Sequence, residues 1–404
     1  YLSNLRSNGE LVFMESKMKK SKTLRVFEAF AGIGAQASAL RRLNINYEIV
    51  GISDWFINAI ECYDAIQNNN KPDIPLPSLK EQIEYLQHYT FSKDSVNPIK
   101  DITKLSEEEI SKLYRSNKRT NNYGSIIDIG NGKINMPDCD LLIYSFPCQD
   151  LSTGGKTKGM KKGSGTRSGL LWEIEKILNK LNKENRLPEY LLMENVKAIL
   201  ADSNKEDFDE WKNFLESIGY KNSDPMVLDA TKFGIPQDRK RCFLLSHLKT
   251  KIDIKPEYIE TNEKFNCLDF LRFNYDDNPI LRAEADAAQL YDTVSRVEMW
   301  NKNKRDPITK DTIIHTITCN MDRSNTAAMF EYAGIKGNTF RLLTIREAFL
   351  LMGFTEEEYE RATMTGLSYR KMNKLIGNSI VVNVLEEIFR FLFADKYAKG
   401  GKDE

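Results

Sequence analysis

Short apolar runs that alternate with helical periodicity are the feature of this sequence that most limits its fold. Strand-like runs lie at 24–29, 47–52, 141–146, 190–193, 226–229 and 242–246. Helical periodicity fits residues 35–44, 57–67, 168–183 and 207–218 and, near the C-terminus, 344–353 and 379–394. A helix between successive strands is the usual connection that parallel strands need. The alternation therefore predicts an α/β fold, with a mostly parallel sheet and helices on both faces.

The alternation breaks twice, and the breaks predict how the chain is divided. Residues 68–122 are rich in proline, charge and asparagine, which is typical of a surface insertion. Residues 251–337 lose the strand–helix rhythm, and we expect them to form a second, smaller domain. The larger domain would then comprise residues 24–250 and 338–404, after a flexible and mildly basic lead-in at 1–23.

Composition excludes several classes of protein. The 404 residues suffice for more than one domain, and the balance of 58 Lys and Arg against 58 Asp and Glu argues against a general polyanion binder. No apolar run reaches the ~18–20 residues that span a bilayer. The first residues lack the layout of a signal peptide. We therefore expect a cytoplasmic protein, with Met14 and Met18 as candidate starts of the natural chain.

Glycines follow the first predicted strand, and an acid and a tryptophan follow the second. Phe30, Gly32 and Gly34 lie in a turn where the backbone can approach a ligand at the carboxyl edge of the sheet. Asp54 is placed to bind ribose hydroxyls, and Trp55 to stack on adenine. A plain turn and a core tryptophan explain the same residues. Position 37 is Ala, so the third glycine of a dinucleotide fingerprint is missing and no pyrophosphate site is expected.

Six cysteines without a CxxC pair, with only three histidines, predict neither a disulfide scaffold nor a metal site. One of them, Cys148, follows Pro147 at the end of a predicted strand, where it is a candidate thiolate nucleophile or an inert buried cysteine. Glu194 and Asn195 end a later strand at the same edge. A carboxylic acid beside a thiol disfavours the thiolate, unless the acid holds a nitrogen of a substrate ring that sulfur attacks.

Basic residues gather at two places. Gln237, Arg239 and Arg241 precede a further strand, and strand alternation points the three side chains the same way, although an exposed charged edge would look alike. Residues 154–167 hold five basic residues, five glycines and no acid. This segment is either a solvated loop or a loop that closes on phosphates.

Six blocks of the sequence occur in a characteristic order. They are FAGIGA from residue 30, SFPCQDLS from 145, RSGLLWEI from 167, MENV from 193, FGIPQDRKR from 233, and RLLTIREAFLLMGF from 341 with GNSIVVNVLEEI from 377. The chain thus resembles the DNA cytosine-5 methyltransferase family, and within it the bacterial enzymes, above all the mollicute CpG methylases. The resemblance implies a Rossmann-like methyltransferase fold in which residues 251–337 form the target-recognition domain.

The resemblance implies S-adenosylmethionine as the cofactor and no metal. The glycine turn would take its methionine part, Asp54 its ribose and Trp55 its adenine, whose amino group would meet Asp128. Many family members carry Glu where this chain has Asp54, which shortens the reach but keeps the charge. The residues implied in cofactor binding are Phe30, Gly32, Gly34, Asp54, Trp55, Asp128, Ile129, Pro147, Asn378, Ser379 and Ile380.

The resemblance also implies a mechanism, which acts on a cytosine flipped out of double-stranded DNA. Cys148 would add to carbon 6 while Glu194 holds ring nitrogen 3 and the exocyclic amine, so that carbon 5 can accept the methyl group. Arg241 would bind the carbonyl oxygen. The implied catalytic residues are Cys148, Gln149, Glu194, Asn195, Arg239 and Arg241. DNA contacts are implied for Ser152, Lys156, Lys158, Lys161, Lys162, Arg167 and Thr316.

Two other functions share part of this pattern. A tRNA-methylating relative carries a Cys-Phe-Thr signature in its recognition domain, which is absent between residues 250 and 340. A catalytically inactive DNA-binding regulator would have lost the Pro-Cys or Glu-Asn residues, and both are present. We therefore expect a monomer that methylates double-stranded DNA, as the modification part of a restriction–modification system with a possible cognate endonuclease. The recognised DNA sequence and the role of residues 68–122 do not follow from the sequence.

Overall fold

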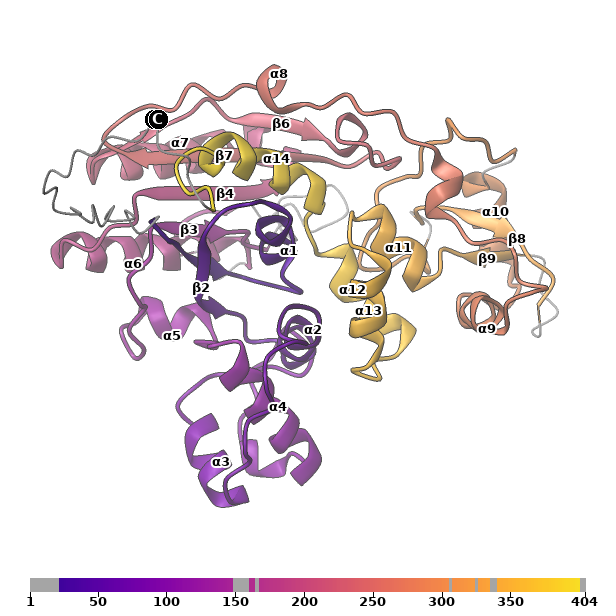
Figure 1. The fold of residues 1–404 in the computed structure, drawn as a ribbon, viewed down its shortest axis with the longest axis horizontal. Coiled ribbons are helices and arrows are strands. Elements are labelled where there is room, and N and C mark those ends of the chain that lie inside the picture. Colours follow the sequence, from indigo (N-terminus) through magenta and orange to yellow (C-terminus); the bar gives the residue numbers. More distant parts are fainter. Residues whose placement is uncertain are drawn as a thin grey trace, which may run out of the picture.

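A seven-stranded sheet organises the larger part of the computed structural model, which describes residues 22–147, 160–163, 167–304, 307–323, 326–334 and 340–399 (Figure 1). Its strands are β1 Leu24–Ala29, β2 Tyr47–Ser53, β3 Leu141–Tyr144, β4 Tyr190–Val196, β5 Tyr220–Asn222, β6 Met226–Asp229 and β7 Lys240–Leu248. The order is β2-β1-β3-β4-β7-β5, and β6 also pairs with β7. Strands β1 to β4 are parallel, and β7 is antiparallel to β4, β5 and β6. The predicted α/β sheet is confirmed.

Helices cover both faces of this sheet. One face carries α1 Ala35–Arg42, α2 Ile57–Gln67 and α14 Val382–Phe393, and the other carries α5 Ile126–Gly130, α6 Leu171–Lys183 and α7 Asp202–Ser217. Adjacent residues of β1 serve opposite faces, because side chains alternate along a strand: Val26 packs in the first layer and Phe27 in the second. The open carboxyl ends of the parallel strands remain between the two helical layers.

Residues 68–122 form two helices, α3 Leu79–Leu86 and α4 Glu107–Arg119, and a 3-10 turn at Ile102–Lys104. Each helix begins with a capping box, in which a serine side chain and a glutamate three residues later satisfy the first free backbone N–H groups. Their apolar side chains pack on α2 through a separate buried cluster that includes Ile60, Leu86 and Leu113. Figure 1 shows both helices at the bottom of the molecule, away from the small segment described next.

The chain after β7 builds a smaller part at the right of Figure 1. The first helix after β7, α8 Pro256–Ile259, still lies by β6 and α14 of the main part, at the top of Figure 1. The smaller part contains α9 Pro279–Ala287, α10 Val294–Asn303 and a two-stranded antiparallel sheet of β8 Met329–Glu331 and β9 Phe340–Leu342. Three helices then lead back to the main sheet, α11 Ile345–Leu351, α12 Glu356–Thr363 and α13 Tyr369–Gly377. Further 3-10 turns lie at Ser168–Leu170, Lys197–Leu200, Ala230–Lys232 and Cys267–Phe270.

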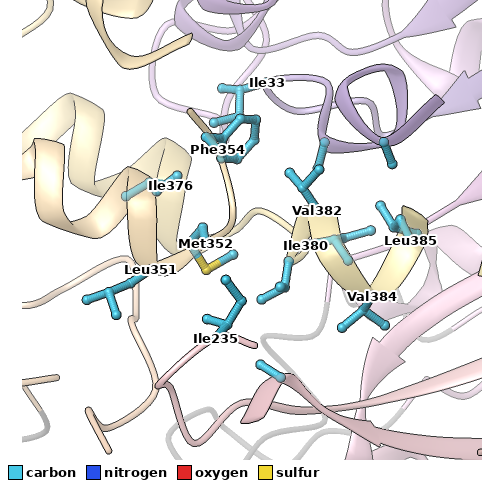
Figure 2. Close-up of a cluster of buried hydrophobic side chains, with 14 of the residues drawn as sticks. Ile33, Ile235, Leu351, Met352, Phe354, Ile376, Ile380, Val382, Val384 and Leu385 are labelled. Carbon is cyan, nitrogen blue, oxygen red and sulfur yellow. The ribbon is translucent and has the colours of Figure 1, made fainter. Parts of the chain in front are cut away.

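One buried apolar cluster joins the two parts. Figure 2 shows Ile235, Met352 and Ile380 packed together between the returning helices and the segment before β7. The same cluster reaches Ile317 and Met329 in the smaller part. The domain boundaries at residues 250 and 338 therefore stay a prediction. Within the described ranges, no helix is both long and apolar enough to cross a membrane.

Candidate active site

A cavity of about 350 Å³ opens at the carboxyl ends of β1 to β4. It is the place where open α/β sheets bind their ligands. The sequence-predicted site residues that line it are Phe30, Gly32, Asp54, Trp55, Pro147, Arg167, Glu194, Asn195, Arg239, Arg241, Asn378 and Ser379. The folded chain thus gathers at one cavity residues that the sequence spreads over some 350 positions.

The turn after β1 lines the cavity with two residues in a left-handed conformation. Phe30 and Gly32 both have left-handed φ values, of 57° and 58°. A Cβ on Gly32 would meet nothing within 4 Å, so the space above it is open. Phe30 holds this conformation without the freedom of glycine, and such local strain is concentrated at functional sites.

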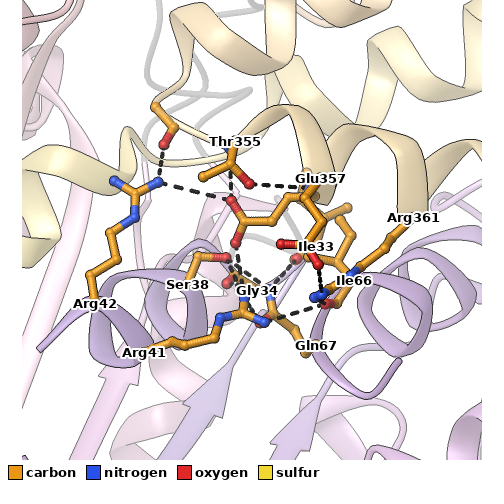
Figure 3. A network of polar contacts seen from close by, with 12 residues as sticks. Ile33, Gly34, Ser38, Arg41, Arg42, Ile66, Gln67, Thr355, Glu357 and Arg361 are labelled. Carbon is orange, nitrogen blue, oxygen red and sulfur yellow. Dashed lines mark hydrogen bonds and ion pairs between the residues drawn. The ribbon is translucent and has the colours of Figure 1, made fainter. Parts of the chain in front are cut away.

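Gly34 does not line the cavity, and its role is to allow close packing behind the turn. It precedes α1 with a φ of 82°, and a Cβ there would come within 2.8 Å of Tyr63. Gln67 donates to the Gly34 carbonyl at 2.9 Å and to Ser38 Oγ at 2.9 Å. Figure 3 shows how this network continues through Arg41 to α12, so the glycine turn is braced by the C-terminal part of the chain.

The carboxylate of Asp54 organises the cavity from the end of β2. Its two oxygens accept the backbone N–H of Gly32 at 2.9 Å and of Phe56 at 2.8 Å. Burial raises the pKa of Asp54 to about 6, although the backbone N–H groups oppose the rise. Asp54 therefore holds the glycine turn in place and changes charge close to neutral pH.

The sequence left open whether Trp55 is a core residue or a ligand-binding residue, and its position in the structure suits both roles. Its partly buried ring packs against the core cluster and also lines the cavity. Ser125, Ile126 and Ile127 also line the cavity. Ser125 caps α5 by accepting the N–H of Ile127 at 3.3 Å. A cavity lined by an indole ring and aliphatic side chains suits a flat heterocycle.

Asp128 and Ile129 do not line this cavity. The Asp128 carboxylate accepts the N–H of Thr90 at 2.9 Å and pairs with Lys133 at 3.4 Å, and Ile129 is buried in the core. Their role at the adenine stays a prediction. Sequence reasoning missed Ser125, Ile126 and Ile127, for which Gly124-Ser125, a left-handed turn followed by a helix cap, is the available signal.

The main chain at the end of β3 is held from both sides. Asn195 donates to the Phe146 carbonyl at 2.9 Å, and Ser168 donates to the Pro147 carbonyl at 2.8 Å. These two bonds fix the point from which the chain continues to residue 148. Five predicted residues lie outside the described ranges, namely Cys148, Gln149, Ser152, Lys156 and Lys158.

Glu194 lies at the end of β4 with 5% of its surface exposed. Arg241 Nε is 3.4 Å from its Oε1 atom, and Ser145 Oγ donates to Oε2. The antiparallel course of β7 explains this meeting, because it pairs Val196 at the end of β4 with Arg241 near the start of β7. Ser145 was missed in the sequence, although it precedes Pro147 by only two residues.

Arg239 is buried and links three segments. Its guanidinium donates to the carbonyls of Ile317 at 2.7 Å, Gly377 at 3.1 Å and Ser379 at 2.6 Å. Of the three residues that alternation was expected to align, Arg239 and Arg241 line the cavity and Gln237 does not. Gln237 is fully buried and bonded to the carbonyl of Leu351 at 2.7 Å, because residues 236–238 pair with the segment around Ile314 instead.

The same pairing places Thr316 at the junction between the two parts. Its hydroxyl donates to the carbonyl of Asp238, and its side chain does not line the cavity. Among the C-terminal residues, Asn378 and Ser379 line the cavity, whereas Ile380 belongs to the apolar cluster in Figure 2. Ile380 thus anchors the wall that its two predecessors form.

Three of the predicted DNA-contacting cations lie in the described stretches, and one of them, Arg167, is at the cavity. Lys161 is exposed, and Lys162 pairs with Glu175 at 2.6 Å above the ring of Trp172. Arg167 lines the cavity and donates to the Ser95 carbonyl at 2.7 Å. The two lysines therefore stand at the surface, where phosphate contacts are made.

Four of the five cysteines in the described ranges are buried, whereas Cys319 is only partly buried. Burial raises the pKa of Cys242 to about 12 and of Cys267 to about 11, and Cys62 and Cys139 are buried with raised pKa values as well. Such thiols are poor nucleophiles at neutral pH. No group of three or more His, Cys, Asp or Glu in these ranges could hold a metal ion.

Comparisons with known proteins agree with the geometry. A family model described as C-5 cytosine-specific DNA methylase matches residues 102–394. The orphan methyltransferase M.SssI of Spiroplasma monobiae is 37% identical over 393 residues, which cover 93% of this chain and 98% of the relative. The Type II methyltransferase M2.ScrFI of Lactococcus lactis subsp. cremoris is 35% identical over 379 residues, 92% of this chain and 99% of the relative.

Solved structures share the fold. The crystal structure of the S. pombe Dnmt2 methyltransferase superposes with a TM-score of 0.59 at 20% identity, and covers 91% of this chain and 98% of its own. That of Spodoptera frugiperda DNMT2, carrying three substitutions, gives 0.57 at 17% identity, with 92% of this chain and 99% of its own covered. The fold and the motifs that line the cavity lead to the same group of proteins.

Proposed function

Because this chain belongs to the C-5 cytosine-specific DNA methylase family and is a DNA cytosine-5 methyltransferase, we propose that its cavity binds S-adenosylmethionine together with a flipped cytosine. One observation supports this proposal. Glu194 contacts both Arg241 and Ser145, and this polar group lines the same cavity as Pro147 and the glycine turn. One cavity thus contains both a place for a cofactor and a polar group suited to a cytosine edge.

The residues present fit S-adenosylmethionine. The open space above Gly32, the Asp54 carboxylate and the Trp55 ring suit an amino acid, a ribose and an adenine in turn. We propose Ser125 and Ile126 as the wall at the adenine, in the role that the sequence pattern had suggested for Asp128 and Ile129. Asn378 and Ser379 would cover the opposite side. When bound, this cofactor supplies an electrophilic sulfonium methyl group.

We propose that Cys148 is the nucleophile. The Cys148 thiolate adds to carbon 6 of cytosine, which makes carbon 5 nucleophilic toward the methyl group. Loss of the carbon-5 proton to a base and departure of the thiolate then restore the ring. Support comes from Pro147, whose position at the cavity is fixed by Ser168, and from the high pKa values of the buried cysteines elsewhere. Gln149 follows at the same place in the chain.

Glu194 would hold the cytosine edge during this addition. A protonated carboxyl donates to ring nitrogen 3 and its other oxygen accepts from the exocyclic amine, which draws electron density from carbon 6. Arg241 and Ser145 keep both Glu194 oxygens in position, and Arg241 is close enough to meet the carbonyl oxygen of the base. Arg239 and Asn195 act on the protein side, because their donors bind main-chain carbonyls.

We propose double-stranded DNA in the cytoplasm as the substrate, bound by a monomer. Residues 24–250 and 338–404 would form the catalytic domain, and residues 251–337 the target-recognition domain, with Thr316 at its edge. Phosphate contacts are assigned to Ser152, Lys156, Lys158, Lys161, Lys162 and Arg167. M.SssI is named an orphan enzyme and M2.ScrFI a Type II methyltransferase, so the relatives include both kinds. We propose a modification enzyme of a restriction–modification system.

Transfer of a tritiated methyl group tests this function with DNA, tRNA and no nucleic acid in parallel. We expect incorporation into DNA alone, and loss of incorporation in Glu194→Ala. Methylation of tRNA in place of DNA would overturn the substrate, and absence of any incorporation would favour a DNA-binding regulator. Bisulfite sequencing of DNA from an expressing host then reads the recognised sequence directly.

A further inference from the structure

The inserted residues 68–122 reach the cavity through one short segment. Thr90 donates its N–H to Asp128, beside the Ser125 wall, at 2.9 Å. Two residues later, the N–H of Ser92 donates to the Trp55 carbonyl at 2.7 Å and its carbonyl accepts the N–H of Ile57 at 3.0 Å. The segment therefore runs along the end of β2 with its backbone bonded to the residues that form the cavity.

The next residues form a rigid turn. The Asp94 carboxylate accepts the N–H groups of Val96 and Asn97, both at 2.7 Å, the Asn97 side chain at 2.8 Å and the Ser92 hydroxyl at 3.0 Å. These bonds, chiefly those from Asn97, lower the pKa of Asp94, so it stays a carboxylate. Ser95 has a left-handed φ of 63°. The turn is thus preorganised by its own side chains.

Two cations from distant parts of the chain hold the far end of the turn. Arg167 donates to the Ser95 carbonyl at 2.7 Å, and Lys374 of α13 donates to the Asp94 carbonyl. Lys374 also lies 4.9 Å from the centre of the Phe56 ring. The segment from Thr90 to Asn97 consequently spans the mouth of the cavity, from the β2 side to the side of Arg167 and α13.

Val96 is the side chain that this turn presents. It lines the cavity together with Ser95, yet 57% of its surface is exposed. A rigid turn that holds an aliphatic side chain open to solvent at a ligand cavity gains free energy when a ligand covers that side chain. We propose that residues 92–97 form the outer wall of the cofactor site, with Val96 packing on bound S-adenosylmethionine. The inference rests on the proposed function of the cavity.

Calorimetric titration of the full chain with S-adenosylhomocysteine tests the wall. Val96→Ala should weaken binding about three- to tenfold, because up to two buried methyl groups are lost. Val294→Ala is the matched control, since Val294 is 80% exposed on α10 and does not line the cavity. This control should bind as tightly as the unchanged chain. Thermal unfolding without ligand should be the same for all three proteins.

A second pair of variants tests the turn itself. Asp94→Ala removes both carboxylate oxygens that accept the N–H groups of Val96 and Asn97, and it should weaken binding at least as much as Val96→Ala. Asp94→Asn keeps one acceptor oxygen and should restore part of the affinity. In turnover assays, Val96→Ala should raise KM for S-adenosylmethionine and leave kcat unchanged. If Val96→Ala bound S-adenosylhomocysteine as tightly as the unchanged chain, the proposal that Val96 packs on the cofactor would be wrong. Failure of the unchanged chain to bind would instead overturn the proposed cofactor site.

Discussion

At the scale of single residues, the carboxylate of Asp54 links the shape of the cavity to its charge. Both oxygens bind backbone N–H groups of the cavity wall, and each still has a lone pair for a ribose hydroxyl. The sequence predicts an acid at the end of the second strand. It does not predict that the acid holds the turn after the first strand, since that contact depends on the positive φ at Gly32.

The pH dependence of cofactor binding follows from Asp54. Its raised pKa of about 6 means that the carboxylate is charged above this pH and neutral below it. Ribose hydroxyls donate to the charged form, so the affinity for S-adenosylhomocysteine should be constant above pH 7 and fall as the pH drops through about 6. Titration calorimetry between pH 5 and 8 is the measurement. Asp54→Ala should bind S-adenosylhomocysteine weakly at every pH. If its affinity still fell as the pH dropped through about 6, a group other than Asp54 would cause the pH dependence.

Cys148→Ser should abolish methyl transfer and leave cofactor affinity near that of the unchanged chain, because sulfur is needed only for attack on carbon 6. The measurement combines turnover with tritiated cofactor and calorimetric titration. Cys267→Ser is the control, since Cys267 is buried and its pKa is raised to about 11, so it should act on stability alone. Retention of a tenth of the turnover in Cys148→Ser would contradict the assignment.

At the scale of elements, β9 and α11 are joined by a fully buried ion pair. Arg341 and Glu347 both have no exposed side-chain surface and meet at 2.8 Å. Glu347 also caps the start of α11 by accepting the N–H of Thr344 at 2.8 Å. The capping box Thr344–Glu347 is readable in the sequence. The arginine partner is not, because it is a charge buried by the fold of the smaller part.

Glu347→Ala should lower the free energy of unfolding by about 3–5 kcal/mol, because it leaves a buried guanidinium without its partner. Glu357→Ala is the comparison, since Glu357 pairs with Arg361 on α12 at 69% exposure, where such a pair contributes less than about 1 kcal/mol. Urea unfolding of both variants gives the two values. Similar losses in both would mean that the buried pair contributes no more than a surface one.

At the scale of the whole molecule, the sequence predicts the sheet better than what surrounds the cavity. Six of the strands were expected from apolar runs, whereas the short β5 was not, because Tyr220–Asn222 has too few residues for a period. Ser125, Ile126 and Ile127 were not predicted to line the cavity, since only the turn at Gly124 marks them in the sequence. The contribution of residues 92–97 depends on backbone contacts with Trp55 that leave no pattern in the sequence.

Electrostatic attraction between the enzyme and DNA should depend on Lys161 and Lys162. Replacing both by Ala should weaken binding to every DNA sequence and flatten the salt dependence by about one unit of slope per lost phosphate contact. Lys162 also loses its half-exposed pair with Glu175, which costs little. The control is Lys80→Ala, whose side chain is 85% exposed on α3. If the double variant instead methylated a different DNA sequence, the two lysines would take part in reading the bases and the assignment to phosphate contacts would be wrong.

The packing of α14 against α1 has a consequence for how the enzyme is made in the cell. The cavity takes residues from Phe30 near one end of the chain and from Ser379 near the other, and Arg239 is bonded to the latter. Ribosomes add about 5–20 residues per second, so on the order of tens of seconds separate the two. A growing chain thus carries its glycine turn long before it can retain a cofactor. We therefore expect that products truncated before Ser379 do not methylate DNA, because they lack part of the cavity wall.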